Sequence, residues 1–162
     1  MATVQDNIEI TGAACDASDG DLLGAAAIRR GVRRTLRAQG LECLDEVPLP
    51  NGRRADVMAL GPQSQIWIIE IKSSIADFRA DQKWPEYCSY CDQLYFAVAP
   101  DFPVEILPAG AGLILADAYG GDVIRHPEPQ PLTASRRKAL TLAFGRLAAA
   151  RLQSLIDPAQ IL

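Results

Sequence analysis

The stretch Ile66-Trp67-Ile68-Ile69-Glu70-Ile71-Lys72 places a carboxylate and an amine in an otherwise apolar run. Its length and β-branched residues predict a strand buried on both faces of a sheet. Because side chains alternate along a strand, we expect Glu70 and Lys72 to share one face with Ile68. Charged groups rarely enter such an element unless they are paired or hold a metal. This strand is therefore a candidate to carry a functional site.

A second apolar stretch, Ala55-Asp56-Val57-Met58-Ala59-Leu60, carries an acidic residue shortly before that strand. Asp56 and Glu70 would supply carboxylates and Ile71 a carbonyl oxygen, the ligands that Mg²⁺, or Mn²⁺ in its place, prefers. Such a metal polarises a phosphate and activates a water. Lys72 would orient that water or offset charge developing on the phosphate. The pattern predicts a magnesium-dependent phosphodiesterase site with Asp56, Glu70 and Lys72 as its catalytic residues.

A structural alternative remains open for the same residues. Glu70 and Lys72 would then form a buried ion pair with a neighbouring strand. Asp56 would only end the turn that begins at Asn51-Gly52. Glu-x-Lys alone is common in exposed strands, but here it lies in an apolar strand and follows an acidic residue on the preceding strand. That combination favours the metal site.

Turn residues and hydrophobic periodicity give the order of the elements. We expect a helix over about 21–39, strands over 41–49 and around Asp56, and a helix over about 74–89 that Pro85 kinks or interrupts. Further strands follow at 92–99, 112–116 and 123–125, and Thr133 caps a last helix. The order predicts an α/β fold with a mixed central sheet flanked by helices. In that sheet, an antiparallel hairpin precedes a parallel strand.

Composition sets the broad class of protein. The chain has 162 residues, which suits a single domain over 19–162 after a mobile tail over 1–18. No stretch is long and apolar enough for a membrane span. The four cysteines do not form a dense framework, which favours a reduced, cytoplasmic setting. Cys88 and Cys91 lack a second spaced pair, so we interpret them as buried thiols rather than zinc ligands.

Arginines crowd one part of the first predicted helix, although the net charge of the chain is −4. They form adjacent stripes on the helix surface. A row of like charges is mildly destabilising, and an anionic partner would relieve it. We therefore expect contact with a DNA phosphate backbone, with a solvated helix face as the alternative. The arginines are Arg29, Arg30, Arg33, Arg34 and Arg37, of which we assign Arg30, Arg33 and Arg34 to DNA binding.

The helix expected after the Glu70 strand adds two further candidates. Lys83 and Tyr87 are four residues apart and would share one face of a continuous helix. Lys83 would then contact a phosphate, and Tyr87 would hydrogen-bond or stack near the strand end. The alternative is that Tyr87 packs on the sheet and Lys83 is solvated.

Two resemblances follow from these residues. Asp56 followed by Glu70-Ile71-Lys72 resembles the PD-(D/E)XK nuclease superfamily, except that Ala55 replaces the proline of its motif. The segments 77–87 and 92–98, with the distinctive Lys83-Trp84-Pro85-Glu86-Tyr87, resemble more narrowly the MmcB-like family of bacterial DNA-repair proteins. The resemblance implies a restriction-endonuclease-like fold, DNA as partner and Mg²⁺ as cofactor.

The leading hypothesis is thus a DNA-repair protein that hydrolyses DNA phosphodiester bonds with Mg²⁺. The alternative is a DNA-binding repair accessory that keeps the fold and cuts poorly. In the superfamily the N-terminal helix often adds an acidic residue to the site, whereas here only Asp19 and Asp21, at the helix start, are available. A third possibility is an interaction domain with Glu70 and Lys72 as a structural pair.

Overall fold

A six-stranded mixed sheet lies at the centre of the computed structural model, which describes residues 19–158. The tail predicted over 1–18 lies outside the described residues. In chain order the elements are α1 (Asp19–Ala38), β1 (Glu42–Pro48), β2 (Arg54–Leu60), β3 (Ile66–Ile71), α2 (Ile75–Ala80), the 3-10 helix η1 (Trp84–Tyr90), β4 (Gln93–Val98), the 3-10 turn η2 (Val104–Ile106), β5 (Gly112–Ala116), β6 (Gly121–Arg125) and α3 (Ala134–Ile156).

The strands lie side by side in sequence order, from β1 to β6. The pairs β1–β2 and β2–β3 are antiparallel, β3–β4 and β4–β5 are parallel, and β5–β6 is antiparallel. Every residue of β3 is buried, as its apolar composition predicts. The expected α/β class, the hairpin and the parallel pair are confirmed.

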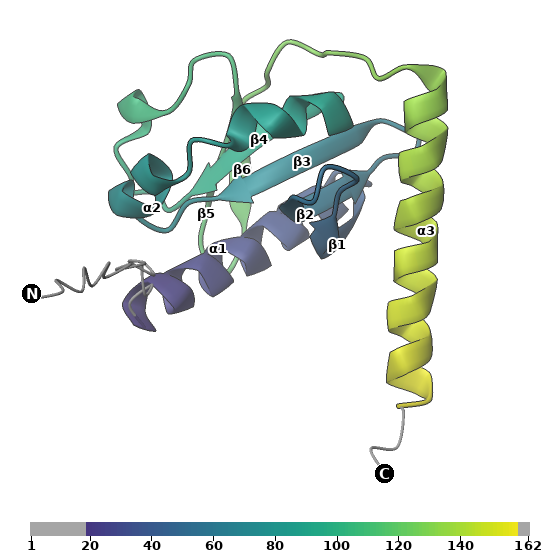
Figure 1. Cartoon of the computed structure of the whole chain (residues 1–162). Helices are drawn as coiled ribbons and strands as arrows, with labels where there is room; N and C mark the ends of the chain where they lie inside the picture. Colours follow the sequence, from purple (N-terminus) through teal and green to yellow (C-terminus); the bar gives the residue numbers. More distant parts are fainter. Residues whose placement is uncertain (1–18, 159–162) are drawn as a thin grey trace, which may run out of the picture.

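Helices cover both faces of the sheet (Figure 1). On one face, α1 buries Ile28, Val32 and Leu36 against side chains that include Trp67 and Ile69. On the other face, α3 buries Leu140 and Phe144, and η1 buries Tyr87, in a cluster that contains Ile68. Neighbouring residues of β3 thus enter different layers, and the predicted alternation along this strand is confirmed.

The helix predicted over 74–89 is interrupted, as expected, but the break begins before Pro85 and separates two short helices. Helix α2 ends at Ala80, and η1 begins at Trp84 with Pro85 in its first turn. Asp81 explains the break, because its Oδ1 accepts a hydrogen bond from the Lys83 amide at 3.0 Å and offers the backbone an alternative to the helix. Pro85 lacks the N–H that a continuing helix would need.

Helix α3 is attached to the sheet at two places. Near its start, Arg137 forms a bidentate pair with the buried Asp92, with both N–O distances at 2.6 Å. Near its end, Arg151 donates to the backbone carbonyls of Asp45 and Glu46 in β1. Thr133 caps the helix as predicted. None of the described helices has the length and apolar character to cross a membrane.

We predict that Gly31→Ala destabilises the protein. A β-carbon at Gly31 would lie under 3.0 Å from the carbonyl oxygens of Asp117 and Gly120, so α1 would have to move away from the β5–β6 turn. Overpacking of this kind costs about 1 to 3 kcal/mol. The matched control is Gly24→Ala in the same helix, where the new β-carbon meets only Ser73 at 3.9 Å. Urea denaturation should show a loss for Gly31→Ala and none for Gly24→Ala; equal midpoints would contradict this packing.

Candidate active site

Asp56 and Glu70 lie opposite one another where β2 and β3 run together. The register pairs Val57 with Ile69, which places Asp56 across from Glu70 on the same face of the sheet. The Asp56 carboxylate accepts a hydrogen bond from the Ile71 amide at 2.8 Å. The Glu70 carboxylate accepts a longer one from the Asp56 amide at 3.4 Å. Each carboxylate is thus held by the backbone of the strand opposite.

Lys72 follows directly after β3, and its side chain is only 4% exposed. Its Nζ lies 4.0 Å from Oε2 of Glu70 and 2.6 Å from Oδ2 of Asp81. The structure therefore brings the three residues of the predicted site together and adds Asp81, the residue that ends α2. One ammonium group is shared by carboxylates from two elements.

Burial and mutual repulsion dominate the electrostatics of this cluster. Burial, reinforced by the charge of Asp56, raises the pKa of the Glu70 carboxyl to about 8. Burial also raises the pKa of Asp56, although the Ile71 N–H and Lys72 act against it. For Lys72 the loss of solvent would lower the pKa, but the hydrogen bond to Asp81 and the negative charges of Asp81 and Glu70 together outweigh it, and the pKa is raised. Asp56 and Glu70 thus have too little positive charge nearby to offset the burial of their carboxyl groups.

The donor set of this cluster fits magnesium better than a soft metal. Asp56 and Glu70 offer carboxylate oxygens, and the Ile71 carbonyl is a third candidate. Mg²⁺ is commonly held by one or two carboxylates together with waters and substrate phosphates. Among the described residues, no group of three or more His, Cys, Asp or Glu side chains is placed to hold a metal. A complete cage of protein ligands, as structural zinc requires, is therefore not formed by these residues.

Asp81 and Glu46 are the two residues near the site that sequence analysis missed. Nothing in the sequence distinguishes Asp81 from an ordinary surface residue, because its contact with Lys72 forms only where α2 ends, at Ala80. Glu46 has a positive φ of 50°, an uncommon conformation outside glycine. Its carboxylate pairs with Arg29 at 2.8 Å and with Arg54. The register places Glu46 opposite Asp56, so an arginine cluster borders the site.

Comparison with known proteins places the chain in a family. Residues 13–159 match the family model described as DNA repair protein MmcB-like. The chain belongs to the MmcB-like family. The solved structure of SPO1766, a protein of unknown function from Silicibacter pomeroyi, is 48% identical to it with a TM-score of 0.80. The alignment covers 83% of this chain and 92% of that chain. No curated protein matches the sequence.

Lys83 and Tyr87 occupy different positions in the MmcB-like fold, so the shared helix face predicted for them is wrong. Lys83 precedes η1 and is exposed, whereas Tyr87 is buried within it. The Tyr87 hydroxyl donates to the carbonyl oxygen of Arg54 at 3.2 Å, and burial raises the pKa of this phenol. Tyr87 therefore supports β2 two residues before Asp56. The break at Asp81 and Pro85 explains why the two side chains separate.

The arginines of α1 line a groove of about 660 Å³ beside β1. Arg33 reaches Asp45 at 3.3 Å, in an exposed pair. Arg34 donates to the carbonyl oxygens of Ala118 and Tyr119 and so holds the β5–β6 turn. Arg30 and Arg37 are exposed and have no ion-pair partner among the described residues. The groove thus contains both structural and unengaged arginines.

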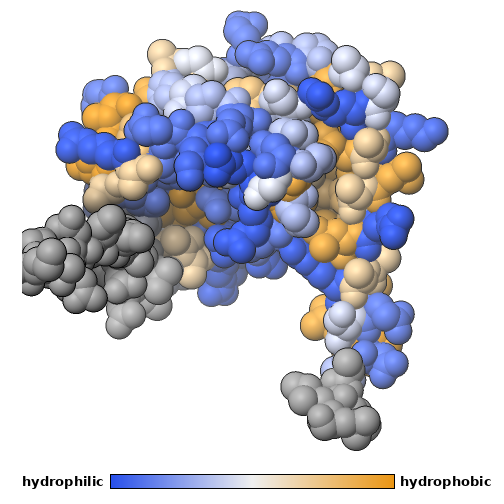
Figure 2. Space-filling model, viewed as in Figure 1, coloured by the Kyte–Doolittle hydropathy of each residue, from blue (hydrophilic) through white to orange (hydrophobic). Residues whose placement is uncertain are grey.

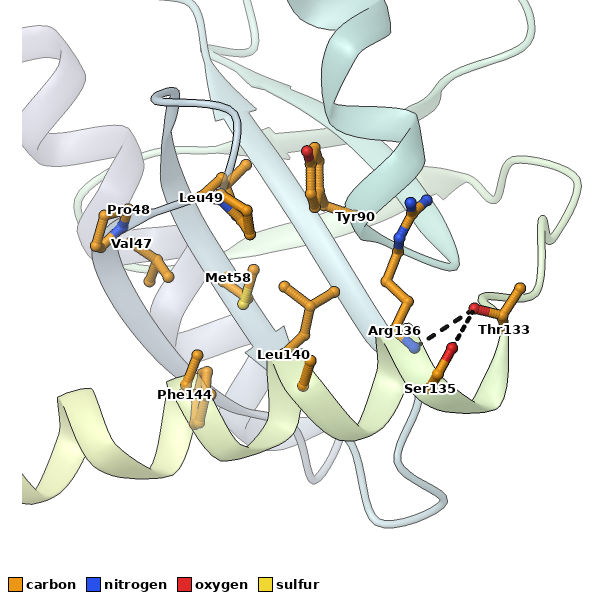
Figure 3. A pocket seen from close by; sticks show the side chains of 13 residues that line it. Val47, Pro48, Leu49, Met58, Tyr90, Thr133, Ser135, Arg136, Leu140 and Phe144 are labelled. Carbon is orange, nitrogen blue, oxygen red and sulfur yellow. Dashed lines mark hydrogen bonds between the residues drawn. The ribbon is translucent and has the colours of Figure 1, made fainter.

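A second cleft of the MmcB-like chain, of about 650 Å³, lies apart from the carboxylates. It is formed between α3, β1 and η1, with Leu140, Phe144 and Met58 on its apolar side (Figure 3). Arg136 lies 5.6 Å from the centre of the Tyr90 ring at its edge. Asp56, Glu70 and Lys72 are not among its lining residues. This cleft is therefore separate from the candidate active site.

We predict that Glu70→Gln flattens the pH dependence of stability. In the unfolded chain this carboxyl titrates near its ordinary value of 4.5, whereas the folded protein retains the proton up to about pH 8. Since the folded state binds more protons between these values, its free energy of unfolding falls as pH rises through this window. The slope reaches at most about 1.4 kcal/mol per pH unit.

Urea denaturation at several pH values between 5 and 8 measures this slope. Wild type should lose stability across the window, and Glu70→Gln should lose much less, with Asp56 leaving a smaller remainder of the same sign. Asp122→Asn, at an exposed position on β6, is the control and should behave as wild type. Parallel profiles for wild type and Glu70→Gln would contradict the burial of this carboxyl.

Proposed function

We propose that this MmcB-like protein is a magnesium-dependent nuclease that hydrolyses DNA phosphodiester bonds in repair. One observation carries the proposal: Asp56, Glu70 and Lys72 converge at the ends of two paired strands. Burial raises the pKa of both carboxyls there, although the Ile71 amide and Lys72 lie close to them. A bound cation would supply the positive charge that the site is short of. The family supplies the context of DNA repair, and the site supplies the chemistry.

Each residue has a distinct role in this proposal. Asp56 and Glu70 would hold the cation, with the Ile71 carbonyl as a third oxygen. Mg²⁺ held there would supply Lewis-acid chemistry to the phosphate and to an attacking water. Lys72 donates hydrogen bonds to the attacking water or to a phosphate oxygen and offsets the developing negative charge. Asp81 positions the Lys72 ammonium through its 2.6 Å contact.

The topology supports a relation to the PD-(D/E)XK nucleases. An N-terminal helix, three antiparallel strands, a helical crossover and a parallel fourth strand follow one another in α1 to β4. Asp56 on β2 and Glu70 on β3 occupy the positions that the superfamily motif implies. The motif residues and the order of the elements thus support the same proposal, that the fold is restriction-endonuclease-like.

The arginine groove supports DNA as the substrate. Arg30 and Arg33 are exposed on α1, and Arg29 of the same helix lies near enough to Asp56 to lower the pKa of that carboxyl in part. A DNA phosphate backbone that follows α1 would therefore approach Asp56 and Glu70. Lys83, exposed in the segment after α2, is a further candidate for phosphate contact.

The second candidate function is a DNA-binding accessory that does not cut. Two observations favour it. Lys72 is engaged by Asp81 rather than free to meet a substrate. Among residues with described side chains, α1 directs Arg29, and no acidic side chain, toward the neighbourhood of Asp56. The two candidates share the fold and the DNA surface, and they differ in turnover.

We predict that Lys72→Ala abolishes most cleavage while metal and DNA still bind. A charge aimed at the transition state typically contributes a few kcal/mol to the rate. The fold should lose less than the roughly 3 to 5 kcal/mol of a stranded buried ion, because Asp81 can turn to solvent and Glu70 can keep its proton. Single-turnover cleavage of a labelled DNA, with Mg²⁺ in excess, measures the effect.

Arg79→Ala is the control, since it removes one exposed positive charge of α2 without touching Lys72. It should leave single-turnover cleavage at saturating protein near the wild-type rate. Wild type that binds DNA but shows no turnover with Mg²⁺ or Mn²⁺ would overturn the nuclease and support the accessory. Undiminished cleavage by Lys72→Ala would reject the role assigned to this residue.

We also predict that Arg30→Gln and Arg33→Gln each weaken DNA binding without regard to base sequence. Each lost phosphate contact should reduce the slope of log affinity against log salt by about 0.7 to 0.9. Arg34→Gln should in addition destabilise the fold, because Arg34 holds the β5–β6 turn. Arg146→Gln, exposed on α3, controls for net charge. Fluorescence anisotropy at several salt concentrations measures this slope. An unchanged slope for Arg30→Gln and Arg33→Gln would support the alternative, that the arginines of α1 are only a solvated helix face.

A further inference from the structure

Helix α3 exposes large apolar side chains along its outer face. Leu142 is 58% exposed and Leu152 is 57% exposed, and at the end of the helix Leu155 and Ile156 reach 79% and 71%. Figure 2 shows hydrophobic surface along this helix, at the right of the view, interrupted by hydrophilic side chains. Exposed leucines and isoleucines that gather on one helix, rather than lying singly over the surface, are typical of an interaction surface.

Leu155 lies on another side of the helix, whereas Leu142, Gly145, Ala149, Leu152 and Ile156 follow a regular spacing. Successive steps of three, four, three and four residues place them on one stripe, which is the spacing of a helix that packs against another helix. The residues that bind α3 to its own sheet lie on the opposite side of the helix and include Leu140, Phe144 and Arg151. The outer stripe consists of Leu142, Gly145, Ala149, Leu152 and Ile156, all of them exposed.

We propose that this stripe is a homodimer interface, in which α3 packs antiparallel against α3 of a second copy. With the twofold axis at Ala149, Leu142 faces Ile156 of the partner subunit. Gly145 then lies within one residue rise, about 1.5 Å along the helix, of Leu152 of the partner subunit. A side chain added at Gly145 would meet nothing within 4 Å in the isolated chain, so there is room for an incoming leucine. The stripe is therefore complementary to itself in volume, as a twofold interface requires.

The charges of α3 favour the antiparallel arrangement over a parallel one. All charged residues within the helix are basic, and three of them fall in its first turns, where the helix dipole is also positive. Arg137 is neutralised by Asp92, but the exposed Lys138 has no ion-pair partner among the described residues. Antiparallel pairing brings Lys138 within one turn of Asp157 and the negative helix end of the partner subunit. Parallel pairing would instead place the basic turns together.

The interface requires no rearrangement of the chain. The outer stripe points away from the sheet, and the last turn of α3 continues beyond Arg151, which makes the final contact with β1 (Figure 1). Asp56, Glu70 and Lys72 do not lie on α3, so the dimer and the candidate nuclease site are separate proposals. Failure of one leaves the other standing.

Analytical ultracentrifugation over a range of protein concentrations tests the interface. Wild-type full-length protein should sediment in a monomer–dimer equilibrium, and Leu152→Glu should shift it to monomer. The matched control is Ser154→Glu, which adds the same charge two residues away on another side of the exposed helix end and should still dimerise. Circular dichroism of each variant checks that the helix is kept.

Disulfide cross-linking tests the geometry independently of folding. Ala149→Cys lies at the proposed axis and should form a covalent dimer on mild oxidation, beyond any dimer that wild type forms. Lys138→Cys lies eleven residues from the axis, roughly 16 Å along the helix, and should not link to itself. Cross-linking of Lys138→Cys with none for Ala149→Cys would overturn the antiparallel arrangement.

Two further outcomes would overturn the dimer itself. Wild type that remains monomeric at every concentration, with no disulfide at Ala149→Cys, would show that a second copy does not cover the stripe. A DNA-induced dimer that Leu152→Glu leaves intact would show that DNA joins the copies by another surface. Either result would mean that a second copy of the chain does not bind the exposed stripe of α3.

Discussion

The burial of charge at the end of β3 is the constraint on which the site depends. The carboxyl group of Glu70 lies within an otherwise apolar central strand and the ammonium group of Lys72 directly follows it, and neighbouring elements must satisfy both. β2 supplies a backbone amide to Glu70 and the carboxylate of Asp56 to the amide of Ile71. The segment that ends α2 supplies Asp81 to Lys72. The packing of three elements is thereby tied to one polar cluster.

That cluster is electrostatically incomplete in the isolated chain. Lys72 is shared between Asp81 and Glu70, and Arg29 and Arg54 are engaged by Glu46. Asp56 and Glu70 are therefore left as two buried acids with raised pKa values. An apolar pair of similar volume would stabilise the fold as well or better. Two buried acids at this position support the proposal that a cation binds between them, together with an anionic substrate.

Much of this arrangement could be predicted from local sequence. The buried run at Ile66–Ile71 and the alternation of its side chains predicted β3 and the face on which each side chain lies, because strand geometry is set by residues adjacent in the sequence. The interruption of the next helix was predicted at Pro85, whereas it begins after Ala80, because the side chain of Asp81 competes with the helix for a backbone amide. The contact of Arg34 with the β5–β6 turn was not predicted, because its carbonyl partners lie more than eighty residues away in the chain. Family membership confirms the resemblance drawn from the Lys83–Tyr87 segment, while the superfamily assignment stays a prediction.

The central claim is that Asp56 and Glu70 form one divalent-metal site. Isothermal titration of the protein with Mn²⁺ and Mg²⁺, in the absence of DNA, tests it without reference to activity. Wild type should bind one ion, Asp56→Asn and Glu70→Gln should each lose that binding, and the exposed Asp122→Asn should retain it. Binding should also tighten as pH rises toward 8, because the Glu70 carboxyl must release its proton. Equal binding by wild type, Asp56→Asn and Glu70→Gln would contradict the account.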